Sequence, residues 1–177
     1  MTTQIFLSML LGLVVGFLGG FIFGYIYCKY LQKPKNITDQ DLIIIDCDAN
    51  PYIPEEWEVV EHRKGGKFNW DPSAVTLYLN EAQKNGGYVS GKELREELKD
   101  KPVMNANVLD WLLAHPEHIP EEWKDKYTFF WGTIYRDSSG SLCVRCLCWG
   151  GGRWCWFGLW LVDAFSGGGP APLRTEK

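Results

Sequence analysis

Four cysteines in the last third of the chain come closest, in residue type and spacing, to a metal site. They are Cys143, Cys146, Cys148 and Cys155, and four thiolates can hold a structural zinc ion in tetrahedral geometry. Zinc ribbons use two Cys-x2-Cys pairs and this chain has one, and on a strand Cys143 faces away from Cys146 and Cys148. We therefore expect buried free thiols and no cofactor. A small structural zinc protein is the first alternative, and a Cys143–Cys155 bridge is expected only outside a reducing compartment.

Two carboxylates one residue apart, Asp46 and Asp48, follow an apolar run, and such a pair at a strand end can share Mg²⁺. A metal-dependent hydrolase or transferase is thus the second alternative, although the chain turns at once and has no further catalytic motif. His115 and His118 flank the end of a predicted helix, where histidine suits the helix dipole without any function. No set of nucleophile, base and orienting group can be assembled, so we expect a protein that is not an enzyme.

Aromatic residues are the strongest candidates for binding. On a predicted last strand, Trp154, Trp156 and Trp160 share one face and Cys155, Phe157 and Leu159 the other. Trp131 and Tyr135 alternate in the same way on an earlier strand. Rigid aromatic side chains give a large contact area for little loss of conformational entropy. We expect these five residues, Trp131, Tyr135, Trp154, Trp156 and Trp160, to bind an unidentified protein, peptide or glycan; burial of all five in the core is the alternative.

The spacing of apolar residues predicts an α+β domain over residues 41–165. Strands are expected near 42–45 and 57–62, followed by a helical part over about 71–125 with three short helices. Asp71 before Pro72 marks the start of the first helix, a capping box at Ser90 and Glu93 marks the second, and Asn105 or Asn107 caps the third.

The segment 129–161 predicts a three-stranded antiparallel β-meander, because its strand-like runs are joined by short turns that contain glycine. Residues 166–177, rich in Gly, Pro and charge, are expected to be a disordered tail. The pentapeptide Ile-Pro-Glu-Glu-Trp occurs at 53–57 and again at 119–123, which we interpret as one turn used twice.

The first 31 residues predict a transmembrane anchor, followed by a polar linker over 32–40. Residues 5–27 carry no charge, and 23 helical residues reach about 34 Å, enough for a hydrocarbon core of about 30 Å. Lys29, Lys33 and Lys35 follow this segment and none precedes it, which favours a single-pass protein with a cytoplasmic soluble domain. Gly12, Gly16, Gly20 and Gly24 recur every four residues. They would form a helix–helix interface for self-association or for a partner transmembrane helix in the lipid bilayer.

Several segments together resemble one family. They are 45–51 (Ile-Asp-Cys-Asp-Ala-Asn-Pro), 105–110 (Asn-Ala-Asn-Val-Leu-Asp), 119–124 (Ile-Pro-Glu-Glu-Trp-Lys) and 130–136 (Phe-Trp-Gly-Thr-Ile-Tyr-Arg). They are similar to a family of small uncharacterised proteins from candidate-phylum (Patescibacteria-type) bacteria. The resemblance covers about 44–165 and implies a bacterial source without an assigned activity. Members often carry aromatic residues where this chain has Cys146, Cys148 and Cys155, so the resemblance implies no essential role for these thiols.

Charge and composition narrow the function further. The formal net charge is -4 and aromatic residues make up 15% of the chain. An acidic chain lacks the clustered Lys and Arg that displace counterions from phosphates, so we expect no nucleic-acid partner. The sequence as a whole predicts a membrane-anchored, non-enzymatic interaction module that presents an aromatic-rich β-sheet domain.

Overall fold

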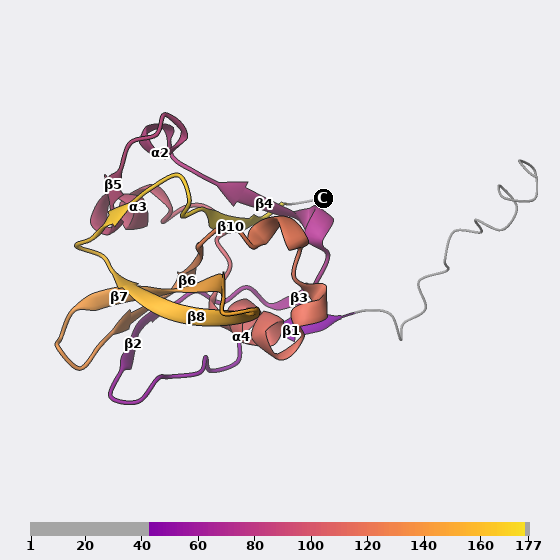
Figure 1. Cartoon of the computed structure of the whole chain (residues 1–177). Helices are drawn as coiled ribbons and strands as arrows, with labels where there is room; N and C mark the ends of the chain where they lie inside the picture. Colours follow the sequence, from indigo (N-terminus) through magenta and orange to yellow (C-terminus); the bar gives the residue numbers. More distant parts are fainter. Residues whose placement is uncertain (1–42, 176–177) are drawn as a thin grey trace, which may run out of the picture. The chain divides into compact units, whose positions relative to one another are not determined.

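The computed structural model describes residues 43–175, and these form a mostly β domain of short elements (Figure 1). The strands are β1 (Ile44–Asp46), β2 (Glu58–His62), β3 (Lys67–Asn69), β4 (Val75–Tyr78), β5 (Val89–Ser90), β6 (Thr128–Arg136), β7 (Leu142–Gly150), β8 (Arg153–Trp160), β9 (Ala164–Phe165) and β10 (Ala171–Arg174). The α-helices are α2 (Glu81–Lys84), α3 (Gly91–Glu97) and α4 (Ala106–Ala114), and single 3-10 turns lie at Pro72–Ala74, Pro116–His118 and Glu121–Trp123. The predicted α+β class is therefore wrong, because strands occupy most of the regular structure and also interrupt the segment predicted to be helical.

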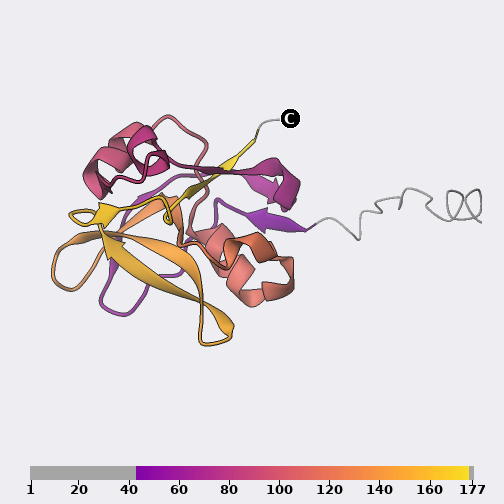
Figure 2. The same cartoon turned by 45° about the horizontal axis from the view of Figure 1, so that its top comes forward.

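The largest sheet is antiparallel, with the order β2-β6-β7-β8. Its last three strands are the predicted meander, joined by tight turns at which Gly140, Gly151 and Gly152 adopt positive φ. The strand near 57–62 was also predicted, but its place as the fourth strand beside β6 was not. Among the described strands β8 has a neighbour on one side alone, so it is an edge of this sheet (Figure 2).

The segment after Asp71 begins as predicted and then departs from the prediction. Asp71 caps a single 3-10 turn by accepting a hydrogen bond from the Ser73 N–H at 2.9 Å. The chain then continues as β4, which pairs along its whole length with β10. The tail predicted to be disordered supplies that partner strand, so both errors have one cause: the partner of β4 lies almost a hundred residues away in sequence.

The next two helices start where their capping residues predicted. Ser90 and Glu93 exchange both hydrogen bonds of a capping box at the start of α3. Asn105 caps α4 by accepting from the Asn107 N–H at 3.2 Å. Both copies of the repeated pentapeptide close a hydrogen bond of the same spacing, because Trp57 N–H donates to Pro54 O and Trp123 N–H donates to Pro120 O. The backbone conformations differ, since Glu56 has a φ of 60° whereas Glu121–Trp123 is a 3-10 turn, so the interpretation as one turn used twice is wrong.

Apolar side chains fill both faces of the large sheet. On one face Phe130 and Leu147 pack with the α4 residues Val108, Leu109 and Leu112. The other face lies under α3, β9 and β10, and its core consists of Val89, Leu94, Leu98, Phe129, Trp131, Ile134, Val144, Cys146, Leu161, Phe165 and Ala171. The large sheet is thus the central layer, which is why the orientation of each side chain on it decides what remains available for binding.

The prediction of a single-pass membrane protein with a cytoplasmic domain needs correction. Within residues 43–175 no helix is long and apolar enough to cross a membrane. The longest of those helices, α4, has nine residues and spans about 13 Å, less than half of a hydrocarbon core. The predicted span and the glycine stripe at Gly12, Gly16, Gly20 and Gly24 lie within residues 1–42, outside the described part of the chain.

Candidate functional site

The five predicted binding residues do not form one exposed face. Trp131 and Tyr135 are buried, with 2% and 0% of their surface exposed, and they lie on opposite faces of the large sheet. Trp154 and Trp156 are half-buried against the α4 side, whereas Trp160 is 48% exposed. The strand period places Trp154, Trp156 and Trp160 on one face as expected, but packing leaves Trp160 as the most exposed of the five.

A buried arginine explains where several of these rings point. The side chain of Arg145 on β7 is 1% exposed and forms a two-point ion pair with Asp110 of α4, at 2.7 and 3.2 Å. Its guanidinium carbon lies 4.2 Å from the ring centre of Trp156, 5.2 Å from that of Tyr52 and 5.9 Å from that of Tyr135. Aromatic faces attract cations, so the three rings are already occupied by a cation of the same chain.

The charge of Arg145 is maintained in spite of its burial. Burial by itself lowers the pKa of the guanidinium, and the hydrogen bond and charge of Asp110 more than offset this, so its pKa is raised. The Arg145–Asp110 pair therefore links β7 to α4 and fixes the inner aromatic residues. The role of this ion pair is therefore structural.

The edge strand β8 carries backbone groups without a partner strand. The Leu161 N–H donates to Leu142 O at 2.8 Å, and Cys143 lies opposite Trp160, so β7 and β8 keep one register throughout. In an antiparallel pair, residues that bond across the ladder alternate with residues that bond outward. The backbone N–H and C=O groups of Trp154, Trp156 and Gly158 therefore point away from β7, where no described strand pairs with them.

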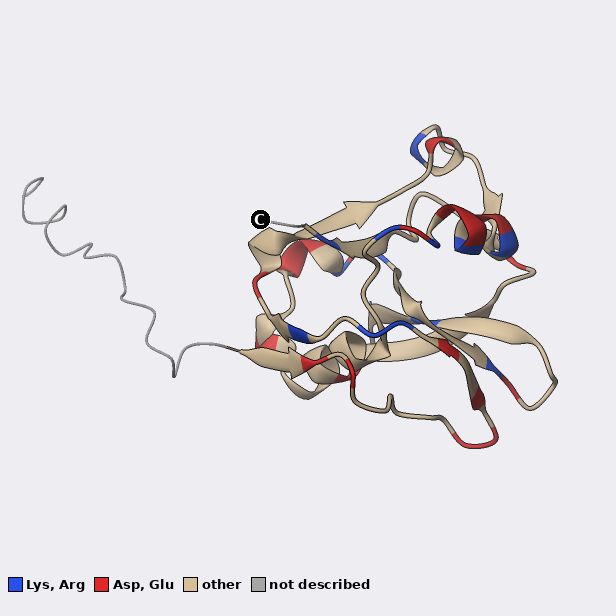
Figure 3. Cartoon of the chain, turned by 180° about the vertical axis from the view of Figure 1, so that it is seen from behind, with Lys and Arg blue, Asp and Glu red and all other residues tan. Residues whose placement is uncertain are grey.

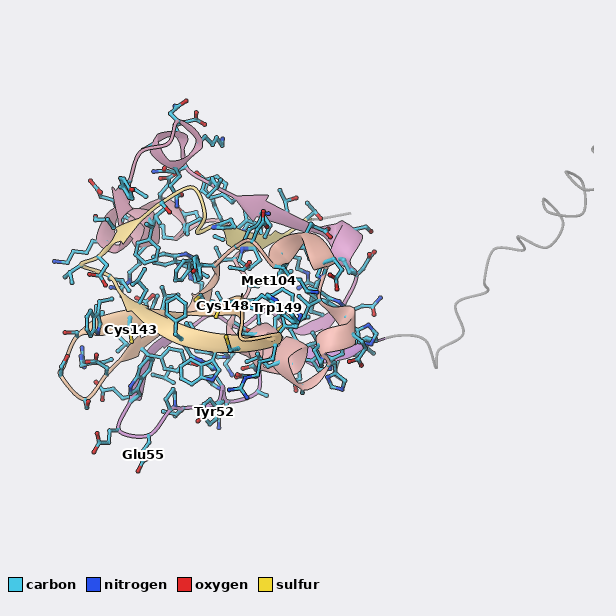
Figure 4. All side chains as sticks on the ribbon, in the orientation of Figure 1. Tyr52, Glu55, Met104, Cys143, Cys148 and Trp149 are labelled. Atoms are coloured by element: carbon cyan, nitrogen blue, oxygen red, sulfur yellow. The ribbon has the colours of Figure 1, made fainter. Side chains whose placement is uncertain are left out.

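Exposed aromatic side chains lie along both sides of this edge. Trp160 is exposed on the α4 face, and its Nε1–H donates to Asp137 Oδ2 at 2.7 Å. On the opposite face Phe157 is 37% exposed and contacts Tyr127, with the ring centres 5.7 Å apart. Near the β7–β8 turn, Trp149 packs edge-on against Trp154 (labelled Trp149 in Figure 4). The edge thus offers backbone hydrogen bonds between two rows of aromatic surface.

The four cysteines of the predicted zinc alternative do not converge. Cys143 faces the α4 side with Tyr135, while Cys146 packs in the core on the other face. Cys148 lies directly opposite Cys155, with their Sγ atoms 3.0 Å apart, and is separated along β7 from Cys143 (Figure 4). Among residues 43–175, no group of three or more His, Cys, Asp or Glu side chains could hold a metal ion. The residue opposite Cys143 is Trp160, so a Cys143–Cys155 bridge does not fit this register.

The buried thiols, defined here as Cys47, Cys143, Cys146 and Cys148, are poor nucleophiles at neutral pH. Burial raises the pKa of Cys47 to about 11 and of Cys143 to about 12, and burial together with the hydrogen bond between the Cys148 and Cys155 thiols raises the pKa of Cys148 to about 12. Burial likewise raises the pKa of Cys146. Nucleophilic attack requires the thiolate, and these thiols hold their protons in the folded protein.

The carboxylates and histidines of the remaining predictions have local roles. Asp46 Oδ1 accepts from the Asp48 N–H, and Asp48 Oδ1 accepts from the Gly66 N–H, each at 2.9 Å, so both carboxylates stabilise turns. His115 stacks on Trp111 with ring centres 4.4 Å apart, and His118 lies against the same indole at 5.3 Å. These contacts account for the four side chains as structural groups.

The sequence did not predict a basic pocket that lies away from β8. Arg63, Lys64, Lys101 and Arg174 line it together with Cys47 and Phe68. The adjacent Arg63-Lys64 pair before two glycines was a visible signal. Arg174 could not have been found because it lies in the tail that was expected to be disordered.

Comparison with known proteins does not assign a function, so the functional interpretation depends on the geometry of the structure. The resemblance to the Patescibacteria-type family stays a prediction. No protein-family model, no curated protein and no solved structure matches the chain.

Proposed function

We propose that this protein is a non-enzymatic interaction module whose edge strand β8 binds an extended, apolar segment of a partner protein by adding it as a fifth strand to the large sheet. The observation that carries the proposal is the outward row of backbone groups at Trp154, Trp156 and Gly158 on an eight-residue edge strand. Main-chain bonds of this kind give affinity in strand addition, and side-chain contacts at alternate positions give specificity.

The composition of β8 supports this occupant. Its sequence, Arg-Trp-Cys-Trp-Phe-Gly-Leu-Trp, has no proline, lysine or carboxylate. Proteins protect free edges with such residues, with bulges or with short strands, because an open apolar edge invites pairing. β8 pairs with β7 at every residue from Arg153 to Trp160 and carries no bulge. An edge without these protections is consistent with one that a partner covers.

The surfaces beside the edge indicate what the partner segment contains. One face offers Trp160, and the other offers Phe157 with Tyr127, so an added strand would meet aromatic surface on both faces. Arg153 is exposed at the start of β8. We therefore infer an apolar segment with a carboxylate at the end that lies beside Arg153.

Amide hydrogen exchange tests the edge directly. Full-length protein is used to select binders from a library of random linear decapeptides, and exchange is then followed with and without a selected peptide. We expect protection to rise at the amides of Trp154, Trp156 and Gly158, because each gains an acceptor from the added strand. Selected peptides that bind without protecting these three amides would contradict the proposal.

Substitutions distinguish peptide binding at the β8 edge from nonspecific hydrophobic binding. Phe157→Lys places a charge beside the edge and should weaken peptide binding at least tenfold, and Trp160→Lys should do the same from the other face. Tyr88→Lys is the matched control, because Tyr88 is 70% exposed and directly precedes β5, which pairs with β9 in a separate sheet from β8. Binding that is insensitive to both edge variants refutes strand addition. Protection of the same amides that rises with protein concentration alone identifies a second copy as the occupant instead.

A further inference from the structure

A second site lies where four separate segments of the chain meet. The turn after β1, the β2–β3 connection, the segment between α3 and α4, and β10 together line a pocket of about 220 Å³. In the view from behind, Lys and Arg positions follow both the β2–β3 connection and the segment after α3 (Figure 3). The pocket depends on tertiary structure alone, since its basic residues are more than a hundred positions apart at the extremes.

The lining of this pocket is cationic. It contains Arg63, Lys64, Lys101 and Arg174, and no Asp or Glu side chain contributes to it. Several exposed cations elsewhere pair with carboxylates, as Arg136 does with Glu58, although among the described residues Lys67, Lys92 and Arg153 do not. Within residues 43–175 none of the four lining cations forms an ion pair, so their charge is not neutralised by a neighbouring carboxylate contact.

Neutral groups hold these cations in place instead. Arg174 Nη1 donates to Gly65 O at 2.9 Å, and its guanidinium carbon lies 4.8 Å from the ring centre of Phe68. Arg63 Nη1 donates to Leu98 O at 2.8 Å. Each guanidinium therefore keeps further N–H groups from which an anion can accept hydrogen bonds.

The ammonium groups of the two lysines also contact neutral groups, and these lie outside the pocket lining. Lys64 Nζ donates to Asp48 O at 3.3 Å, and Lys101 Nζ lies 4.9 Å from the ring centre of Tyr78. Asp46 and Asp48 are the nearest acidic influence on Cys47 at the pocket wall. The Asp48 carboxylate accepts a hydrogen bond from the Gly66 N–H and, among the described residues, forms no ion pair with a lining cation, so it offsets the charge of the lining only in part.

From this geometry we infer a binding site for a small dianionic phosphate monoester. Four cationic side chains carry more positive charge than is needed to neutralise a single carboxylate. The N–H donors of arginine also match the acceptor oxygens of a phosphate group. Most of the rest of the wall is apolar, with Phe68, Pro102, Val103, Met104 and Val108, and Asn105 is its uncharged polar residue. That half suits the carbon body of the ester, and the volume limits the body to a small group.

Isothermal titration of the full-length protein with phenyl phosphate, inorganic phosphate and benzoate at constant ionic strength tests the inference. Phenyl phosphate should bind at least tenfold more tightly than benzoate, because its second charge meets more of the four cations. Binding of phenyl phosphate well above that of inorganic phosphate marks a monoester site, whereas equal binding restricts the ligand to the free ion and overturns the monoester. Absence of phosphate binding at concentrations up to about 10 mM overturns the site itself.

Matched variants locate the binding. Arg174→Gln should weaken phenyl phosphate binding about tenfold, and Lys101→Gln several-fold, because each removes one charge-assisted contact. Arg136→Gln, an exposed arginine outside the pocket, should stay within twofold of the unmodified protein. If Arg174→Gln does not fold because it loses the Arg174–Gly65 hydrogen bond, the affinity measured for Lys101→Gln decides the outcome. Unchanged affinity in Lys101→Gln together with unchanged affinity in folded Arg174→Gln would place the phosphate elsewhere and refute the assignment.

Discussion

The ion pair between Arg145 and Asp110 gives the most decisive test of how the sheet is held together. Asp110→Asn removes one charge while keeping the size of the side chain. The Arg145 side chain is 1% exposed and that of Asp110 is 29% exposed, so the substitution leaves a buried cation without its counter-charge. Breaking such a pair is costly because the remaining charge stays out of water.

The magnitude follows from the geometry. Two unit charges about 4 Å apart attract by about 4 kcal/mol at an effective dielectric constant of about 20. Asparagine can still accept one of the two hydrogen bonds, and water reaches part of the Asp110 side chain, so we expect a loss of about 2–3 kcal/mol in the free energy of unfolding. For a protein of this size that loss lowers Tm by about 5–10 °C.

Urea unfolding followed by tryptophan fluorescence measures this loss, with Glu58→Gln as the control. Glu58 pairs with Arg136, but both side chains are well exposed, at 60% and 43%, so the control should lose less than about 1 kcal/mol. The double variant Asp110→Asn/Arg145→Met should be more stable than Asp110→Asn, because it no longer buries an unpaired charge. Equal losses in Asp110→Asn and Glu58→Gln, or a double variant that is less stable than Asp110→Asn, would refute the reasoning.

Three further predictions concern the sheet and its thiols. A Cβ on Gly158 would lie 2.5 Å from Trp57 Cη2, so Gly158→Ala should lower the free energy of unfolding by about 1–3 kcal/mol. In the control Gly150→Ala, the new Cβ would first meet Cys155 Sγ at 3.7 Å, and the loss measured by calorimetry should be less than half as large. Glutathione disulfide at pH 9 should convert Cys148 and Cys155 to one intramolecular disulfide with release of two glutathione molecules, since their Sγ atoms are 3.0 Å apart; peptide mass mapping that finds a bridge elsewhere, or none, contradicts this. Unfolding returns the pKa of Cys47, Cys143 and Cys148 from about 11, 12 and 12 to about 9, so the folded state keeps protons that the unfolded state loses above pH 9. The contribution of these three thiols to the free energy of unfolding should therefore be fully present below pH 9 and should fall between pH 9 and 11 by up to about 1.4 kcal/mol per pH unit for each thiol. A urea midpoint that is flat between pH 9 and 11 would show that the thiols are not desolvated.

The sequence by itself determined the features that depend on a few neighbouring residues. The capping box at Ser90 and Glu93 and the Asn105 cap form as their local chemistry predicts, and both copies of Ile-Pro-Glu-Glu-Trp form a turn. The three meander strands were also predictable, because the turns between them are short and contain glycine. Each of these signals is satisfied within about a dozen residues.

Tertiary structure decided the identity of the segments whose partners lie far away. The apolar residues from Val75 to Leu79 fit a helical spacing, yet β4 forms because β10 supplies backbone partners from the end of the chain. The same long-range pairing brings Arg174 to the pocket at Arg63 and Lys64, which no local pattern indicated.

Packing also decided which aromatic residues stay exposed. Alternation along a strand predicted that Trp154, Trp156 and Trp160 share a face, but it could not predict that Arg145 and Trp57 cover part of that face. A side chain's face follows from the strand period, whereas its exposure depends on what the rest of the chain places against it. For that reason the sequence identified the aromatic strand, and the fold alone showed that, among the described strands, its outer backbone edge has no partner.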